Sequence, residues 1–487
     1  VLHYRCDNSQ LSGILWDFSF FTKFANLFFF QYKLQMKFLG LRLCEHDSNI
    51  SYSDGTTVKY FKFERYNQIK HYGCQNLMDW TKTEKILNFK IEELDAIAIV
   101  LDVFRYPSIK KEDPKKLFEK ISIPFKPFLD IKCPVYRLDH HYAHKLSNWP
   151  LVDISDVDFV LDGFGDLERS CSIFREHKLE EVYTLDKMQS FGIHLASIGK
   201  HLNISGMGYD AAGKVMALKQ FGNFNAEYFD RISNLNLENS KSIFDFKKFI
   251  DVIGSEIVAN YKFLDYVRTL HDYMEIAFSN FFSKRANSKE IVTYSGGVAH
   301  NVCINTKIRE KLPNLIIPPH CNDEGLSLGC IEFLRKNFNQ PKFDKKNFPF
   351  WQSDVKPKVS VTKKTIKETA EKLAQGKIIG WYQGHGEIGP RALGNRSILM
   401  SPEVRNGKSI LNQKVKHRED YRPFAASILS ENVEDFFDWK GESNFMKYTV
   451  KFKDKIFEPI SHIDNTSRIQ TVSKDLEIFY DLINEFK

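Results

Sequence analysis

The chain has 487 residues, of which 43% are hydrophobic and 27% are charged, and its net charge is +7 at pH 7. This length accommodates two or three domains, and the composition is that of a globular enzyme, which excludes a fibrous or wholly disordered chain. The mild positive excess permits anionic substrates but does not by itself argue for nucleic acid. The eight cysteines include no CxxC pair, which disfavours a zinc knuckle, and their scatter suits a reducing, cytoplasmic compartment.

The N-terminal stretch, residues 1–35, is apolar but is interrupted by Asp17 and Lys23. A membrane span needs about 20 mostly apolar residues, and no small-residue cleavage site follows this stretch. We expect the folded protein to start at Met36 and residues 1–35 to lie outside the fold. A membrane anchor or targeting segment is the alternative.

Strands and helices alternate over residues 36–340, which predicts an α/β domain. Buried strands are expected at 37–43, 93–102 and 157–166, with 169–176 as the hairpin partner of the last. Helices are expected from residue 139 and at 211–222. A strand–glycine turn–helix unit is expected over 290–312, and a strand–loop–helix unit over 314–337. Residues 341–360, rich in Pro, Lys and polar side chains, are predicted to be a linker. A second domain over 361–487 then begins with a helix and two strands around a glycine-rich loop.

The stretch "DHHYAHKLSNWP" (139–150) carries His140 and His144 four residues apart, so a helix would place both on one face. The metalloprotease pattern requires Glu after the first His; His141 stands there instead, which argues against peptide hydrolysis. Asp162, at a predicted strand end, and Asp323, at a predicted helix start, are candidate further ligands. Such a set suits Fe2+, with Zn2+ or Mn2+ as alternatives. The spacing alone fits ordinary helix histidines as well as a metal site.

Two glycine turns follow predicted strands: Gly296 and Gly297 in "TYSGGVAHN", and Gly163 and Gly165 in "LDGFGD". Such turns let backbone N–H groups approach a phosphate at a helix N-terminus, although neither is a Walker A loop. A single Gly-rich turn is often only a turn. Two of them in one α/β domain resemble the paired phosphate loops of actin-like ATPases, with "LCEHDSN" (43–49) in the place of the first loop.

Cations gather in "GHGEIGPRALGNRSILMSP" (384–402) and "NQKVKHREDYRPFAAS" (412–427). Arginine binds phosphate and carboxylate in a fixed bidentate geometry, so several convergent guanidiniums predict a polyanionic ligand such as a nucleoside triphosphate. A solvated basic face is the alternative, but the interleaved Gly, Pro, Leu and Phe favour a packed loop. Nucleic acid is the rival ligand, and the long lysine runs of a backbone-tracking patch are absent.

At these residues the sequence resembles the O-carbamoyltransferases of the nodulation-factor and antibiotic-tailoring type. The matching motifs occur in the family's order over roughly residues 36–480: "GLRLCEHDSN", "DHHYAHKLS", "VLDGFGD", "AGKVMALKQFG", "YSGGVAHN", "NDEGLSLG", "GPRALGNRSIL", "VKHREDYRPFAASIL" and "HIDNTSRIQTV". The resemblance implies a two-lobed actin-like (ASKHA) α/β domain over 36–340, similar to the tRNA threonylcarbamoyl transferase domain, followed by an α+β YrdC-like domain over 361–487. It implies that the second domain joins carbamoyl phosphate with ATP to give carbamoyl-adenylate, and that the first transfers the carbamoyl group to a substrate hydroxyl.

The resemblance also implies roles for individual residues. Metal ligands are expected at His140, His144, Asp162 and Asp323. His46 matches an active-site histidine and is the candidate general base, a place beside the metal site being the alternative. The positions expected to hold ATP, its Mg2+ and carbamoyl phosphate are Gly163, Gly165, Gly213, Gly296, Gly297, Asn301, Arg391, Arg396, Lys416, Arg418, Arg422 and Arg468.

The expected acceptor is a hydroxyl of a small molecule or glycoside; no stable nucleic-acid partner and no membrane partner are expected, and a homodimer is compatible with the sequence. A tRNA threonylcarbamoylation enzyme and a nucleotide-binding relic without turnover are the rival interpretations. The family's Asn-Thr-Ser-Phe-Asn motif does not follow "RIQTV" before Lys487, and His300 replaces an apolar residue beside a glycine turn. An incomplete YrdC-like domain is therefore expected, with adenylate formation the half-reaction most affected.

Overall fold

The computed structural model describes residues 35–43, 46–74, 76–101, 116–121, 128, 130–204, 208–234, 236–238, 254–255, 263–353, 360–454 and 456–487. The expected N-terminal extension, apart from residue 35, lies outside this part of the chain. Among the described helices, none combines the length and apolar character that crossing a membrane requires.

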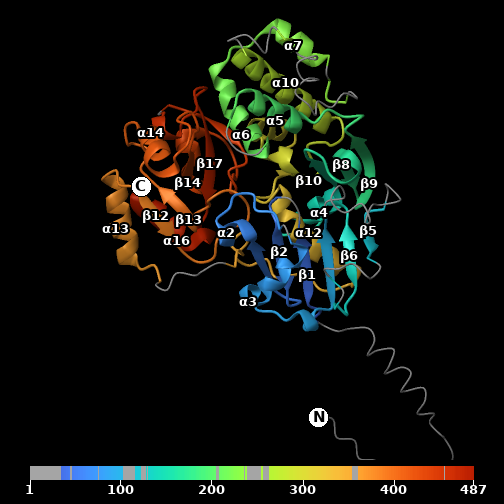
Figure 1. Cartoon of the computed structure of the whole chain (residues 1–487). Coiled ribbons are helices and arrows are strands. Elements are labelled where there is room, and N and C mark those ends of the chain that lie inside the picture. Colours follow the sequence, from blue (N-terminus) through green and yellow to red (C-terminus); the bar gives the residue numbers. More distant parts are fainter. Residues whose placement is uncertain are drawn as a thin grey trace, which may run out of the picture.

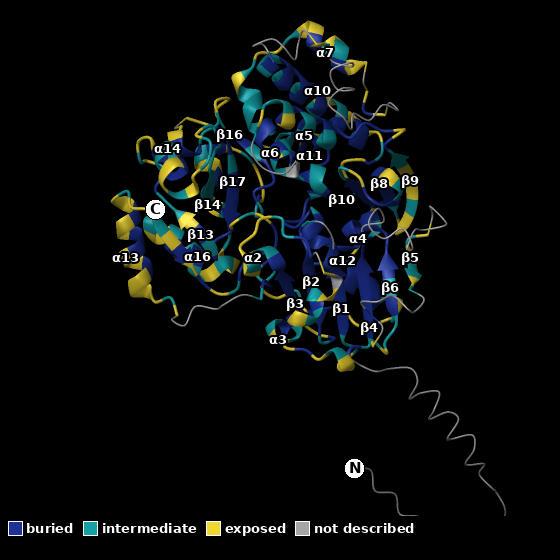
Figure 2. Ribbon diagram, in the orientation of Figure 1, coloured by how far each residue is buried: buried dark blue, intermediate teal, exposed yellow. Residues whose placement is uncertain are grey.

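The first sheet has the strand order β3-β2-β1-β4-β6-β5. β1 pairs antiparallel with β2 and parallel with β4, β2 pairs antiparallel with β3, and β4 pairs parallel with β6. β1, β2 and β4 are buried on both faces (Figure 2), and β4 is a continuous apolar run, "AIAIV", whereas the edge strand β5 is largely exposed. The bounds are β1 Phe38–Arg42, β2 Asn49–Ser53, β3 Val58–Lys62, β4 Ala96–Val100, β5 Phe118–Lys120 and β6 Val135–Leu138.

The second sheet has the order β11-β10-β7-β8-β9. Here β7 pairs antiparallel with β8 and parallel with β10, β8 pairs antiparallel with β9, and β10 pairs parallel with β11. Each sheet thus carries an antiparallel hairpin on one side of its first strand and parallel strands on the other, and in the first sheet β5 adds an antiparallel edge beside β6. This repeated order is that of the actin-like fold, so the predicted two-lobed α/β class is confirmed. The bounds are β7 Val157–Leu161, β8 Arg169–Arg175, β9 Lys178–Thr184, β10 Val292–Ser295 and β11 Leu315–Ile316.

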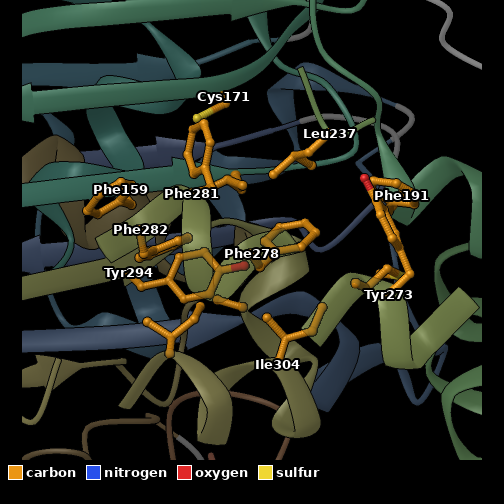
Figure 3. Packing of buried hydrophobic residues seen from close by; sticks show 14 of the residues in the cluster. Phe159, Cys171, Phe191, Leu237, Tyr273, Phe278, Phe281, Phe282, Tyr294 and Ile304 are labelled. Atoms are coloured by element: carbon orange, nitrogen blue, oxygen red, sulfur yellow. The ribbon is translucent and has the colours of Figure 1, made fainter. Parts of the chain in front are cut away.

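Helices cover both sheets (Figure 1). α12 packs across β1, β2 and β4 of the first sheet, and α10 packs with α6, α7 and α11 in the second lobe. The second-lobe core is aromatic: Phe159 stacks on Phe282 with ring centroids 4.0 Å apart, and Tyr294 meets Phe282 edge-on (Figure 3). The helices are α2 Phe63–Asn67, α3 Glu84–Leu87, α4 His140–Leu146, α5 Phe191–His201, α6 Gly208–Leu218, α7 Ala226–Ser233, α10 Phe263–Ser283, α11 Val302–Lys311 and α12 Leu326–Asn337.

Gly40 in β1 allows α12 to approach the first sheet closely. A Cβ at this position would lie 2.2 Å from the Ser327 carbonyl oxygen and 2.9 Å from Cys330 Cβ. Gly40→Val is therefore expected to lower the free energy of unfolding by about 3 kcal/mol, because the sheet and the helix must separate. Denaturant unfolding measures this, with Gly380→Val, where an added Cβ meets nothing within 4 Å, as the control. Equal stability of the two variants would contradict the packing described.

The C-terminal part has two small sheets. β12 (Ile379–Tyr382) and β13 (Arg396–Leu399) form an antiparallel pair, and a second sheet has the order β14-β17-β16-β15. β14 runs parallel to β17, whereas β16 pairs antiparallel with β17 and β15. The remaining bounds are α13 Lys363–Ala374, α14 Gly407–Leu411, β14 Ala425–Leu429, α15 Val433–Phe436, β15 Phe437–Asp438, β16 Thr449–Phe452, β17 Thr466–Val472 and α16 Glu477–Phe486. This part is α+β, and its YrdC-like identity stays a prediction.

The C-terminal part packs against the second lobe, through β16 and α11 (Figure 2). The Asn305 side-chain amide donates to the Lys447 carbonyl at 3.0 Å. The Arg309 guanidinium lies over the rings of Trp439 and Tyr448, 5.0 and 4.9 Å from their centroids. These contacts place the arginine-rich loops next to the actin-like lobes.

Part of the predicted linker belongs to the first lobe. Trp351 stacks on Trp149 with centroids 5.5 Å apart, and the backbones of Trp351 and Ser353 hydrogen-bond to Tyr60 in the edge strand β3. The Ile388 amide donates to the Pro349 carbonyl at 2.8 Å. Residues 341–353 therefore cover a sheet edge and do not span solvent; residues 354–359 lie outside the described chain.

Candidate active site

The histidine stretch opens helix α4. Asp139 is its N-cap and accepts a hydrogen bond from the Tyr142 amide at 3.0 Å, while its second oxygen accepts from Arg169 Nη1 at 2.8 Å. Held in this way, the helix presents His140 and His144 on one face, with ring centroids 4.9 Å apart.

The structure brings all four predicted metal ligands together. The Nε2 atoms of His140 and His144 lie 3.0 and 3.2 Å from Asp162 Oδ2, and each lies 3.4 Å from Asp323 Oδ1. Asp162 directly follows β7, and Asp323 opens the short helical turn before α12. One ligand atom from each residue lies within 4.8 Å of all the others. Two imidazole nitrogens and two carboxylates, nearly all buried, are a donor set that fits a divalent cation.

Neighbouring groups fix both carboxylates in their ionised form. Burial alone would raise the pKa of Asp162, but His140 and His144 hold it well below its usual range. Burial likewise opposes ionisation of Asp323, which is held ionised by His140 and by Arg42, whose Nη2 donates to Oδ2 at 2.7 Å. Burial lowers the pKa of His140, yet the charges of Asp323 and Asp162 outweigh it and raise that pKa to about 10. The four side chains thus form an electrostatically coupled unit.

The glycine turns help to position these ligands, while their binding of phosphate stays a prediction. The amides of Gly163 and Gly297 donate to Asp162 Oδ1 at 2.7 and 3.1 Å. The amides of Gly296 and Gly165 donate to carbonyls of neighbouring loops, at 2.7 and 2.8 Å. Gly296 has φ +94°, and a Cβ there would lie 2.0 Å from a carbonyl oxygen of β7. The two amides that donate to Asp162 thus orient its carboxylate.

Three further predicted binding positions have different surroundings. Gly213 is exposed on α6, and a Cβ there would meet nothing within 4 Å, which leaves space beside the helix. Asn301 caps α11, its side-chain oxygen accepting from the Ile304 amide at 3.2 Å. Arg396 donates to the carbonyls of Gln383, Asn395 and Gly384 and lies 3.6 Å from the centroid of Tyr382. Asn301 and Arg396 thus contact the local backbone, and their binding of ATP or carbamoyl phosphate stays a prediction.

Four of the other predicted cations are half-buried and lie close together: Arg391, Arg418, Arg422 and Arg468. The fifth, Lys416, is exposed at the edge of this cluster. Burial lowers the pKa of Arg468, and the charges of three neighbouring arginines lower it further. Burial together with Arg422 and Arg391 lowers the pKa of Arg418 to about 10. In the described part of the chain, Arg391 and Arg468 form no ion pair with a carboxylate, and Arg468 Nε is buried without a hydrogen-bond partner. Arg422 also lies 3.7 Å from Glu419, and an anion bound among the four guanidiniums would reduce their mutual repulsion.

Lys447, which the sequence analysis did not identify, joins the cation cluster to the His/Asp cluster. Its Nζ lies 3.2 Å from Cys321 Sγ, 3.3 Å from the Pro319 carbonyl oxygen and 3.3 Å from His300 Nδ1. Cys321 is two residues before Asp323, and Cys321 and Arg391 are close enough to affect each other's pKa. A lone lysine in "FMKYTV" offers no sequence signal.

Arg42 was also missed, although a charged residue ending an apolar strand is a signal of a buried partner. His46 lies at the rim: its Nε2 is 3.9 Å from Asp323 Oδ2, and its Nδ1 is 3.1 Å from Asp47 Oδ2. The two residues before His46 lie outside the described chain.

Comparison with known proteins points to one family. Residues 370–487 match the family model described as "Carbamoyltransferase C-terminus". The chain is 32% identical over 385 residues to the protein MJ1051 of Methanocaldococcus jannaschii, covering 72% of each chain. It is 27% identical over 393 residues to the nodulation protein NolNO of Sinorhizobium fredii, covering 72% of this chain and 56% of that protein.

A shorter match is to the 3'-hydroxymethylcephem-O-carbamoyltransferase of Amycolatopsis lactamdurans, at 32% identity over 166 residues, 33% of this chain and 32% of that one. The chain thus spans little more than half the length of NolNO. The matched family model, these relatives and the repeated actin-like sheets agree with the motifs found in the sequence. The chain belongs to the carbamoyltransferase family.

Proposed function

We propose that the protein uses ATP and carbamoyl phosphate to form carbamoyl-adenylate and transfers the carbamoyl group to a hydroxyl of a small molecule or glycoside. The carbamoyltransferase relatives support carbamoyl transfer. The finer chemistry rests on one observation: a cluster of four guanidiniums lies next to a buried His/Asp cluster, on the two sides of residues 319–324. Within the described part of the chain, two of the four, Arg391 and Arg468, form no ion pair with a carboxylate, whereas Arg422 pairs with Glu419 at 3.7 Å.

The cation cluster would bind the anionic reactants. Arg391, Arg418, Arg422 and Arg468 would hold the phosphate groups of ATP and carbamoyl phosphate by charge-assisted hydrogen bonds, with Mg2+ on ATP. Bound phosphates would relieve the mutual repulsion that now lowers the pKa of Arg418 and Arg468. In this step water cleaves the bond between the carbamoyl group and phosphate, which releases inorganic phosphate. An oxygen of the resulting carbamate attacks the α-phosphate of ATP, so that carbamoyl-adenylate forms and pyrophosphate leaves.

The His/Asp cluster would serve the transfer step. His140, His144, Asp162 and Asp323 would hold a divalent cation, Fe2+ being favoured by the ligand set and Zn2+ or Mn2+ being the alternatives. When bound, that cation would act as a Lewis acid towards a carbonyl or phosphoryl oxygen. The acceptor hydroxyl attacks the carbamoyl carbon, AMP leaves, and His46 at the rim would take the hydroxyl proton on Nε2. Lys447, whose side chain lies between the two clusters, would stabilise negative charge on the carbamoyl-adenylate.

Incubation with ATP, [14C]carbamoyl phosphate and a panel of glycosides and other hydroxyl compounds tests this proposal. We expect ATP-dependent transfer of label to a hydroxyl acceptor, with release of AMP and pyrophosphate. Labelling of tRNA that requires threonine, with no labelled hydroxyl product, would instead establish a threonylcarbamoylation enzyme and overturn the proposal.

A further inference from the structure

A chain of hydrogen bonds runs from the candidate base to the opposite lobe. Asp47 is buried and divides its carboxylate between two imidazoles: Oδ2 faces His46 Nδ1 at 3.1 Å, and Oδ1 faces His71 Nδ1 at 3.0 Å. The other nitrogen of His71 faces Asp210 Oδ1 at 3.1 Å. Asp210 stands in the first turn of α6, in the second lobe, whereas the other three residues belong to the first.

The proton positions in this chain follow from its chemistry. An ionised carboxylate only accepts hydrogen bonds, so each imidazole nitrogen that faces one must carry a proton. His46 is therefore held as the Nδ1–H form, which leaves the Nε2 lone pair directed away from Asp47, as a general base requires. His71 faces a carboxylate at both nitrogens and so carries both protons. Burial lowers its pKa, but Asp210 and Asp47 outweigh burial and raise it to about 9.

The surroundings of Asp47 and His71 keep this geometry. Glu64 accepts from the His71 backbone amide at 2.7 Å, and Lys62 Nζ lies 3.7 Å from Asp47 Oδ1 and 2.6 Å from Glu324. Asp47 itself has φ +53°, in the left-handed region, which aspartate adopts more readily than most residues other than glycine. Lys70, which is exposed, contacts Asp210 from outside the chain of bonds.

We infer that His71 is a positioning residue for His46: it holds the Asp47 carboxylate that fixes the His46 ring, and Asp210 of the opposite lobe holds His71. The base is thus oriented only when the two lobes lie together. The inference rests on the proposed role of His46 and assigns a function to three residues outside the metal and phosphate clusters.

Two conservative variants separate the two bonds of His71. In His71→Asn the amide nitrogen stands near the place of Nδ1 and can still donate to Asp47. In His71→Gln it reaches the place of Nε2 and can still donate to Asp210. We expect His71→Asn to retain most of the carbamoyl transfer and His71→Gln to lose about 10- to 100-fold in kcat with KM for ATP unchanged. Lys70→Met, which removes only the outer contact to Asp210, is the control and should transfer at the wild-type rate.

A spectroscopic readout needs no turnover. In side-chain 15N spectra of histidine-labelled protein, the His46 signals are identified by their loss in His46→Gln. We expect one Nδ1–H tautomer in the wild type and in His71→Asn, and a mixture of tautomers in His71→Gln. Absence of transfer by the wild type would count against the proposed function and leave this spectrum to decide the inference.

Two outcomes would overturn it. If His71→Gln keeps the wild-type His46 tautomer and turnover while His71→Asn loses turnover, the contact of His71 with Asp210 of the second lobe is what matters, and His71 does not orient the base. If neither variant changes the His46 tautomer, His71 has no positioning role. Thermal unfolding of both variants accompanies the assay, since His71 has φ +54° and asparagine tolerates this conformation better than glutamine.

Discussion

His144→Ala is expected to lower the bound divalent metal from about one equivalent per chain to below about a tenth, because it removes one of only four ligands. His144 is fully buried, and its Nε2 lies within 3.4 Å of both carboxylates. Its loss leaves Asp162 and Asp323 facing each other with one histidine between them. The fold should survive, because alanine favours the helix and truncation of one core side chain costs about 2–4 kcal/mol.

The matched control is His141→Gln on the same helix. The His141 ring faces Ser172 at 2.9 Å and not the carboxylates. Metal content measured on purified protein, alongside circular dichroism, should fall in His144→Ala and stay near the wild-type value in His141→Gln. A folded His144→Ala protein with wild-type metal content would refute the site.

Arg468→Met is expected to reduce carbamoyl-phosphate-dependent ATP–pyrophosphate exchange by about 100- to 1,000-fold while leaving thermal stability unchanged or slightly raised. The loss of exchange activity and the unchanged or raised stability have one physical reason. Arg468 lies among three other guanidiniums, and in the described part of the chain Arg468 itself has no carboxylate partner. Its charge therefore opposes folding until an anion binds. An arginine kept for structure would show the reverse pattern.

Arg405→Met is the control for removal of one positive charge, since Arg405 is exposed in the same C-terminal part. It should change neither exchange nor stability by more than about 0.5 kcal/mol. If Arg468→Met unfolds at a markedly lower temperature and keeps its exchange activity, the cation cluster is a structural feature and does not bind the reactants.

The sequence predicted the strands and helices that carry strong periodicity. "AIAIV" and "VDFVL" are apolar runs of strand length bounded by turn residues, and both are buried strands. The hairpin partner of β7 was predicted at 169–176, and β8 covers Arg169–Arg175. The packing of residues 341–353 was not predictable, because Phe343 and the short run "FPFW" (348–351) stand in a stretch otherwise rich in Lys and polar residues. Local composition does not show that such residues cover a sheet edge.

Site residues could be predicted where their spacing along the chain places them on one face of a helix. They could not be predicted where their contacts come from residues distant in the sequence. The i, i+4 spacing of His140 and His144 predicted a shared face, and Asp162 and Asp323 lie opposite it. The contacts of the glycine amides with Asp162 were not predictable, because Gly–Gly fits a phosphate and a tightly held carboxylate equally well. The contacts of Arg396 were not predictable either, because the sequence does not show that its guanidinium donates to three backbone carbonyls.

His71 and Asp210 were missed for a related reason. They are 139 residues apart, and each looks like an ordinary surface residue until the lobes bring them together. Long-range pairs of single residues leave no local periodicity, so the geometry alone reveals them.

The most direct test of carbamoyl activation is the exchange of labelled pyrophosphate into ATP by the wild-type protein, with and without carbamoyl phosphate. The proposed function predicts exchange that requires carbamoyl phosphate and that needs no hydroxyl acceptor, because carbamoyl-adenylate forms and reverts at the cation cluster. ATP binding without any carbamoyl-phosphate-dependent exchange would contradict it and would leave a nucleotide-binding protein that does not activate the carbamoyl group.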